Sequence, residues 1–381
     1  DDLKEIYKRE NDMRSEFERD YTRILHCNAY RRLKHKTQVF FSPENDHVCT
    51  RIEHVMHVES VSYTIAKYFG LNTELTKAIA TGHDIGHSPF GHAGERILSE
   101  ISQKEIGENF WHERNGMEYV DKIELLQDMN QNWQNLNLTY AVRDGIISHC
   151  GEIDENSLKP RSQAIDLKDY TKPNEYSPYT WEACVVKISD KISYIGRDIE
   201  DAFHLNLLNN EKLEELKNIL GIQNKEALNN PNIINELIID ICNNSTIEKG
   251  ICFSTEKLNL INKIKEFNYN NIYSHPRLDA SNEYFKIIIN RIYNTLKNAY
   301  DKENTLSNLE ELKKFYPQTI IRFKDWLHKY WNLTDRTNTN LKNKIIYDYT
   351  NPQDYYKAII DFIAGMTDNY AIDMYNEIVS F

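Results

Sequence analysis

The sequence contains no apolar run that approaches the roughly 18 to 20 residues of a membrane span. It also lacks an excess of positive charge, because its net charge is −12. A phosphate backbone would be repelled at long range, so we do not expect nucleic acid as a primary partner. The six cysteines form no CxxC pair, which predicts reduced thiols in a cytoplasm rather than a disulfide framework or a zinc ribbon.

The composition is that of a large folded protein. Its 381 residues are 40% hydrophobic and 27% charged, enough to bury a large core in one domain or two. Apolar residues at helical spacing dominate the readable segments, so we predict an all-α fold with at most one or two short strands or hairpins. The expected strand is Val39–Phe41. Helices are predicted to begin near Thr50, at Asn72 or Thr73, and around Ser88 or Pro89.

The most informative stretch is Thr81–His92, which reads TGHDIGHSPFGH. It places three histidines and an aspartate within twelve residues. The adjacent pair His83 and Asp84 can offer one ion an imidazole nitrogen and a carboxylate oxygen. A single His-Asp pair arises often by chance, so its meaning depends on ligands from other helices.

Two such candidates lie on separate predicted helices. His54 continues the apolar stripe of one helix at its first turn. Asp190 shares a helix face with Tyr194 and Asp198, spaced by four residues, beside a stripe of isoleucines and valines. A histidine on a buried stripe is usually a core residue, and a polar face is often solvated. Both the structural and the functional interpretation therefore stay open for these two segments.

Positive charge gathers locally despite the acidic total. The cluster consists of Arg31, Arg32, Lys34 and Lys36, with Arg51 shortly after. It is either a solvated helix face or an anion site. Arg51 lies one turn before His54, where its guanidinium could hold a phosphate beside an ion. Farther on, His92 and Glu95 are three residues apart on one helix face; Glu95 is either a solvated charge or the carboxylate that orients His92.

The set His54, His83–Asp84 and Asp190, with its surrounding residues, resembles the HD-domain hydrolases, and among them the dGTPase-like deoxynucleoside triphosphate triphosphohydrolases. The resemblance runs from about residue 21 to 204 and returns near 361–370. It implies that these four side chains bind one divalent ion. Such a mixed nitrogen and oxygen site suits Mn²⁺, Fe²⁺, Co²⁺, Ni²⁺ or Zn²⁺, and Mg²⁺ less well.

The resemblance also implies roles for other residues. His92 would be the catalytic histidine and Glu95 its acidic partner. His112 would contact the scissile phosphate. The substrate would contact Gln38, Arg51, His87, Lys191, Tyr194, Asp198 and Tyr370, with Gln38 and Asp198 at the deoxyribose. Asp368 is a further candidate beside Tyr370, and both are either site residues or residues that pack helices together. Glu113 and Asn115 depart from the bacterial pattern, in which Asn and Gln commonly follow the histidine at 112.

The implied reaction is hydrolysis of a dNTP, either dGTP or several dNTPs, to deoxynucleoside and inorganic triphosphate. The family also implies a homo-oligomer, hexameric or dimer-based, and a nucleotide effector. We predict a catalytic helical HD core at 1–204, a helical insertion or C-terminal subdomain at 205–350, and a C-terminal helical segment at 351–381 that packs back on the core. This last segment is expected to break at Gly365.

Three alternatives remain. The chain could be another HD phosphohydrolase or phosphodiesterase, acting on nucleotide mono-, poly- or cyclic phosphates. It could be a di-metal oxygenase or phosphodiesterase of the HD group, in which case His57 or His87 would supply further ligands. It could be a nucleotide sensor or single-strand-binding module without catalysis, against which the intact set of ligands, His92 and Glu95 argue.

Overall fold

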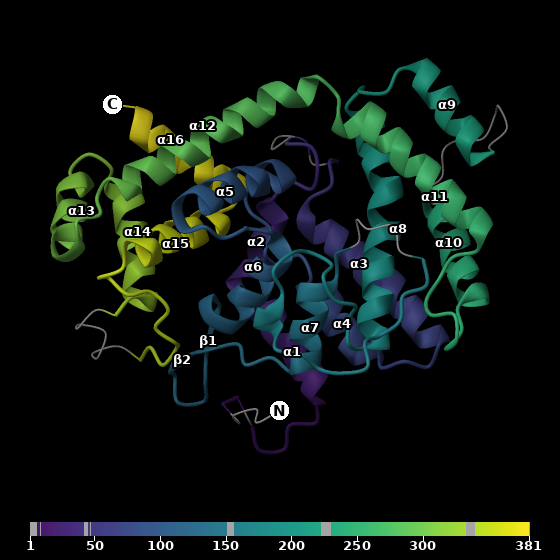
Figure 1. Cartoon of the computed structure of the whole chain (residues 1–381), viewed down its shortest axis with the longest axis horizontal. Coiled ribbons are helices and arrows are strands. Elements are labelled where there is room, and N and C mark those ends of the chain that lie inside the picture. The colour runs from purple at the N-terminus through teal and green to yellow at the C-terminus, as the bar shows by residue number, and fades with distance from the viewer. Residues whose placement is uncertain are drawn as a thin grey trace.

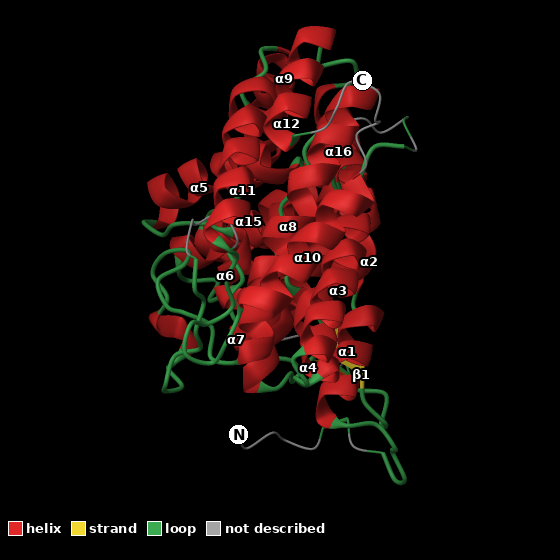
Figure 2. Cartoon of the chain, turned by 90° about the vertical axis from the view of Figure 1, so that its right-hand side faces the viewer, coloured by secondary structure: helices red, strands yellow, loops and turns green. Residues whose placement is uncertain are grey.

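The computed structural model describes residues 6–7, 9–41, 45, 47–150, 156–221, 230–332 and 340–380. These residues form sixteen α-helices, and the predicted all-α fold is confirmed (Figure 2). Strand pairing among the described residues is confined to one antiparallel hairpin, β1 (Leu125–Gln127) with β2 (Trp133–Asn135), and to isolated bridges. None of the described helices combines the length and the apolar character needed to cross a membrane.

The helices follow one another along the chain, and the connection from α7 to α8, residues 149–180, is the longest (Figure 1). The first eight are α1 (Glu16–His26), α2 (Asn28–Arg32), α3 (Arg51–Tyr68), α4 (Thr73–Gly82), α5 (Gly91–Ile106), α6 (His112–Glu118), α7 (Tyr140–Ser148) and α8 (Trp181–His204). The other eight are α9 (Asn210–Leu220), α10 (Asn230–Asn244), α11 (Thr255–Asn268), α12 (Arg277–Lys297), α13 (Thr305–Lys313), α14 (Pro317–Tyr330), α15 (Pro352–Ala364) and α16 (Asp368–Val379).

Local sequence explains where the helices around the site begin. At the start of α3 the Glu53 carboxylate accepts a hydrogen bond from the Thr50 backbone N–H at 2.8 Å. At the start of α4 the Asn72 side chain accepts from two backbone N–H groups. Both predicted starts are confirmed. The predicted start of α5 was early, because the left-handed backbone of Phe90, with φ of 64°, delays the helix until Gly91.

The strand predicted at Val39–Phe41 is wrong. The segment is a series of bends, and the bridge nearest to it joins Thr37 to Thr50. No other segment lies alongside it as a strand in the described structure, so its apolar side chains serve a different purpose. Phe40 is buried, and all three side chains of the segment line the cavity described below.

The site is built on a bundle in which α3 and α4 pack on each other and on α8, and α1 packs on α4 (Figure 1). Residues 205–350 contribute to two hydrophobic cores. Helices α9–α11 share the core of α8, whereas α12 crosses the molecule to pack on α5, α15 and α16. The break between α15 and α16 falls at Gly365, as predicted. The site thus lies between this bundle and the segment 265–285, which runs from the end of α11 into α12.

Candidate metal centre and its cavity

Four side chains from three helical segments meet at one point. His54 lies in the first turn of α3, His83 and Asp84 follow α4, and Asp190 lies in the middle of α8. The His54 Nε2 atom is 2.9 Å from Asp190 Oδ1, and His83 Nε2 is 3.5 Å from Asp84 Oδ1 and 4.0 Å from Asp190 Oδ1. Ligand atoms of one octahedral ion lie about 3.0 to 4.2 Å apart when the bonds are ~2.1 Å long. The set therefore has the size of a single ion site.

The hydrogen bonding of His83 fits this interpretation. Its Nδ1 lies 2.6 Å from the Ala80 carbonyl oxygen, so Nδ1 carries the proton and donates it. The opposite nitrogen, Nε2, is buried and has no hydrogen-bond partner among the described residues. A buried lone pair aimed at two carboxylates is what a divalent cation requires of a histidine ligand. The residues present thus fit an ion bound by nitrogen and oxygen.

Arg51 connects this set to the segment before α3. Its Nη1 donates to Asp84 Oδ2 at 3.1 Å, while Nε and Nη2 donate to the backbone carbonyls of Thr37 and Gln38 at 3.2 and 3.3 Å. Burial tends to raise the pKa of Asp84, but His87, His83 and Arg51 hold it well below its usual range. Arg51 therefore fixes Asp84 in its ionised form and positions Gln38 at the same time.

Two other members of the basic cluster, Arg32 and Lys36, have structural partners. Arg32 pairs with Glu124 at 2.8 Å, and the Lys36 ammonium donates to the backbone carbonyls of His87 and Ala364. Arg31 and Lys34 are exposed. Within the described chain the cavity is lined by Arg51 alone of this cluster.

A second group of polar side chains, formed by His92, Glu95 and His112, faces the four-residue set across the corner between α4 and α5. Glu95 lies 3.2 Å from His92 Nδ1, as its spacing predicted, and it also accepts from the His112 backbone N–H at 2.8 Å and faces His112 Nδ1 at 3.1 Å. Burial lowers the pKa of His112, but Glu113 and Glu95 raise it to about 10. His112 is therefore an imidazolium at neutral pH and carries positive charge at the cavity wall.

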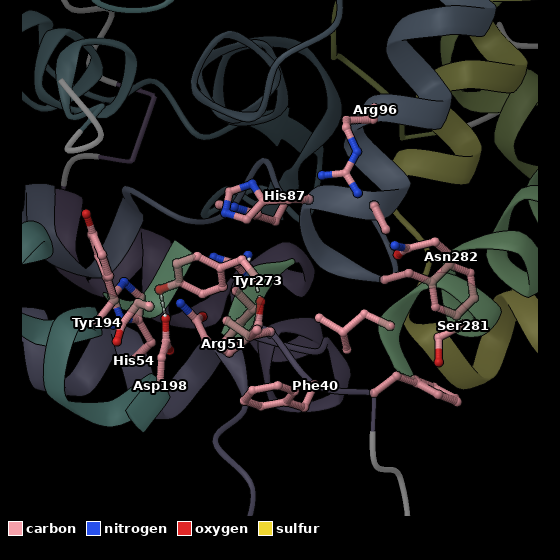
Figure 3. Close-up of a pocket in the computed structure, with 18 of the residues that line it drawn as sticks. Phe40, Arg51, His54, His87, Arg96, Tyr194, Asp198, Tyr273, Ser281 and Asn282 are labelled. Atoms are coloured by element: carbon pink, nitrogen blue, oxygen red, sulfur yellow. Dashed lines mark hydrogen bonds between the residues drawn. The ribbon is translucent and has the colours of Figure 1, made fainter. Parts of the chain in front are cut away.

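Both groups open into a cavity of about 570 Å³ (Figure 3). Its walls include most of the residues predicted to contact substrate, namely Gln38, Arg51, His87, Tyr194 and Asp198. Lys191 and Tyr370 are not among the described residues that line it, so their contact with a substrate stays a prediction. Lys191 is buried in the packing of α8, and Tyr370 lies on α16, near Arg322 and Asp325 of α14.

One wall presents unpaired hydrogen-bond acceptors. Gln38 Oε1 and Asp198 Oδ1 are buried without a partner in the described part of the chain. The other oxygen of Asp198 accepts a hydrogen bond from the Tyr273 hydroxyl (Figure 3). Burial raises the pKa of Asp198 to about 6, although the bond from Tyr273 acts in the opposite direction. This wall is suited to a ligand that donates hydrogen bonds, such as a hydroxyl group.

Sequence reasoning missed several residues of the site. Tyr273 comes from the turn at 269–273, in a region without a recognisable motif, and Arg96 points into the cavity from α5 (Figure 3). His149 follows α7 and places its ring 4.9 Å from the ring of His83. A usable signal existed for His149, since it ends an apolar helix in the same way as His83.

Comparison with known proteins agrees with this geometry. The HD domain family matches residues 51–195, and the phosphohydrolase-associated domain matches residues 324–377. A deoxyguanosinetriphosphate triphosphohydrolase-like protein of Caldanaerobacter subterraneus subsp. tengcongensis is 31% identical over 368 residues, covering 96% of this chain and 86% of the relative. Proteins with the same description from Rickettsia bellii and Clostridium tetani are each 30% identical, covering 96% and 98% of this chain and 92% and 88% of their own.

Proposed function

Because this chain belongs to the HD-domain phosphohydrolases, in the deoxyguanosinetriphosphate triphosphohydrolase-like family, we propose that it hydrolyses a deoxynucleoside triphosphate to deoxynucleoside and inorganic triphosphate. The substrate is dGTP or several dNTPs. The observation that carries the proposal is that one cavity is lined by three of the four ion-site residues, His54, Asp84 and Asp190. The same cavity is lined by Gln38 and Asp198, each with an acceptor oxygen that has no partner among the described residues.

In this proposal His54, His83, Asp84 and Asp190 hold one divalent cation. HD domains bind such ions, and the two imidazoles favour Mn²⁺, Fe²⁺, Co²⁺, Ni²⁺ or Zn²⁺ over Mg²⁺. When bound, the ion supplies Lewis acidity to an oxygen of the α-phosphate. The protein contributes the orientation of the ligands, since Arg51 holds Asp84 and the Ala80 carbonyl holds His83.

Proton transfer is assigned to His92, which lies at the cavity with nearly half of its side chain exposed. Glu95 accepts from Nδ1, so that Nε2 is the nitrogen that takes a proton from water or gives one to the leaving 5′-oxygen. His112, held as an imidazolium by Glu95 and Glu113, meets the negative charge that develops on the phosphate oxygens. The two histidines thus have separate roles, one in proton transfer and one in charge stabilisation.

The sugar is assigned to the wall formed by Gln38, Tyr194 and Asp198. Gln38 Oε1 and Asp198 Oδ1 are acceptors without a partner among the described residues, and a 3′-hydroxyl would donate to them. Tyr194 lines the same wall from α8 and would crowd a 2′-hydroxyl. A preference for deoxyribonucleotides over ribonucleotides follows from this arrangement.

The test is to incubate the purified protein with each dNTP and Mn²⁺ and to separate the products by ion-exchange chromatography. Release of inorganic triphosphate supports the proposal, and Asp190→Asn should abolish it. Pyrophosphate or monophosphate as the product would refute it. Equal rates with ribonucleotides would favour another HD phosphohydrolase that acts on nucleotide mono-, poly- or cyclic phosphates.

A further inference from the structure

We propose that Asp368, the first residue of α16, is a positioning residue for the proposed reaction. Its carboxylate fixes the Phe90 backbone just before α5 and thereby the place of His92, to which proton transfer is assigned. The inference rests on the proposed function, because it concerns the alignment of groups that this reaction uses. Asp368 is not among the described residues that line the cavity, so it acts through its neighbours and not on the substrate.

The Asp368 carboxylate joins two segments that are far apart in the sequence. Its Oδ2 atom accepts hydrogen bonds from the backbone N–H and the hydroxyl of Thr37, at 2.9 and 2.5 Å. Its other oxygen, Oδ1, accepts from the backbone N–H of Phe90 at 2.8 Å. Asp368 is 5% exposed, so water competes little for these bonds. One carboxylate thereby holds the residue before Gln38 and the residue before α5.

Phe90 is the point at which a small displacement would reach the chemistry. Its backbone is left-handed, with φ of 64° and ψ of 25°, which a residue with a side chain adopts only where its surroundings impose it. The bond to Asp368 supplies part of this constraint. The ring of Phe90, stacked on Phe285 with 4.3 Å between centroids, supplies another part. Helix α5 begins at the next residue and carries His92 in its first turn, so the direction of His92 depends on the Phe90 backbone.

The segment at Thr37 is held from two sides. Its N–H bonds to Asp368, and its carbonyl accepts from Arg51 Nε at 3.2 Å. Arg51 Nη2 also donates to the Gln38 carbonyl at 3.3 Å. This segment lies against the start of α5, since a Cβ atom built on Gly91 would be 3.1 Å from the Gln38 carbonyl oxygen. Asp368 and Arg51 together therefore fix the sugar wall relative to the helix that carries the proton-transfer group.

A buried cation accompanies the carboxylate. Lys36 is 2% exposed, and its ammonium donates to the backbone carbonyls of His87 and Ala364. Its charge acts on Asp368 and favours the ionised carboxylate. Such a group either positions the Phe90 backbone for the reaction or only attaches α16 to the core. The two roles differ in their effect on turnover.

Asp368→Asn tests the inference, because it keeps the shape of the side chain but offers one acceptor oxygen in place of two. With that oxygen toward the two donors of Thr37, the amide group meets the Phe90 N–H and the bond is lost. We expect kcat for triphosphate release from a dNTP with Mn²⁺, per folded molecule, to fall about ten-fold to 100-fold, because a slight misplacement of a reacting group costs this much. KM should change less, since the segment before Gln38 keeps its support.

Glu377→Gln is the matched control. Glu377 lies on the same helix, and one of its oxygens accepts from the Gln318 N–H while the other accepts from the N–H and hydroxyl of Thr319. This carboxylate thus has the same set of donors as Asp368, but at the start of α14. Neither it nor its partners are among the described residues of the cavity. It should leave kcat and KM unchanged. An equal loss of kcat in both variants overturns the inference, and so does an unchanged kcat in Asp368→Asn.

Hydrogen–deuterium exchange gives a readout that needs no substrate. In the unaltered protein the Phe90 amide should exchange slowly although it precedes the helix, and Asp368→Asn should speed its exchange while Glu377→Gln does not. Fast exchange in the unaltered protein overturns the inference without any variant. A protein that shows this pattern and releases no triphosphate would refute the proposed function and leave the role of Asp368 at Phe90 intact. Triphosphate release with a Phe90 amide that is insensitive to Asp368→Asn would do the reverse.

Discussion

Tyr273 donates its hydroxyl proton to the carboxylate that we assign to the sugar. Tyr273→Phe removes this donor and keeps the ring. Without it Asp198 loses the contact that fixes its orientation, so we expect KM for a dNTP to rise roughly five-fold, corresponding to about 1 kcal/mol for one hydrogen bond. The change in kcat should be smaller, because Tyr273 does not touch the ion site in the described structure. Steady-state kinetics measure both quantities.

Tyr269→Phe is the control for this variant. Tyr269 lies in the same turn and lines the same cavity, but it is 65% exposed and does not bond to Asp198. It should leave KM nearly unchanged. Equal effects of the two substitutions would show that the hydrogen bond from Tyr273 to Asp198 is not the cause of the change in KM.

The same carboxylate predicts a pH dependence. Burial raises the pKa of Asp198 to about 6, and the bond from Tyr273 lowers it. Above this pKa the carboxylate is ionised and accepts from a sugar hydroxyl, and below it one oxygen becomes a donor. Affinity, measured as 1/KM, should therefore fall as the pH drops through about 6. In Tyr273→Phe the midpoint should move to higher pH; a midpoint that does not move would contradict the assignment.

For individual residues, the sequence was informative where the residue type and its spacing along a helix pointed to the same role. Residue type and helical position singled out His54, His83, Asp84 and Asp190, the resemblance to the HD-domain hydrolases grouped them, and the folded chain does bring them together. The direction of the Tyr370 side chain could not be read from the sequence. It depends on how α16 is oriented, and the contacts of Asp368 fix that orientation. The Asp368 carboxylate accepts from the backbone N–H groups of Thr37 and Phe90, and a residue two positions later points roughly 200° around the helix.

Among the elements, the corner between α4 and α5 is the most tightly constrained. A Cβ atom on Gly86 would lie 2.0 Å from the His112 carbonyl oxygen and 2.2 Å from the Gly116 backbone nitrogen. These atoms belong to α6, so Gly86→Ala must push apart the two elements that carry the ion site and His112. We expect a loss of about 3 kcal/mol or more in the free energy of unfolding, measured by urea titration.

Gly107→Ala separates this steric effect from a backbone effect. Gly107 has φ of 73° but no atom within 4 Å of a built Cβ, so alanine there meets only the left-handed backbone. Its cost should be about 1 to 2 kcal/mol. It should also leave turnover per folded molecule unchanged, since it lies at the far end of α5 from His92. Equal destabilisation by the two substitutions would contradict the close approach at Gly86.

The boundaries of helices were predictable where they are set by residues close by in the sequence. The starts of α3 and α4 follow from capping residues close in sequence. The segment at 39–41 was not predictable as a loop, because three consecutive apolar residues look alike whether they pair with a neighbouring strand or line a cavity. The start of α5 was displaced by Phe90, whose backbone N–H bonds to Asp368 from the end of the chain.

For the whole molecule, the limit of prediction lies in residues 205–350. Their helical character was readable, but not that α9–α11 would join the core of α8 while α12 crosses to α5 and α15. These contacts depend on the shapes of surfaces that form only after folding. Tyr273 was missed for this reason, since it reaches the site through the turn between those two halves.

The four-residue set joins helices that are distant in sequence, so ion binding should stabilise the molecule as a whole. An ion that binds only the folded chain adds about 2.7 kcal/mol at a concentration one hundred times its Kd. We therefore expect Mn²⁺ to raise Tm and a chelator to reverse the rise. Asp190→Asn removes the ligand from α8 and should abolish most of the increment, whereas Glu377→Gln, which alters a carboxylate bonded to α14, should keep it. If Asp190→Asn showed the full increment, the ion would be bound without α8, and the site would not be the one that closes the bundle.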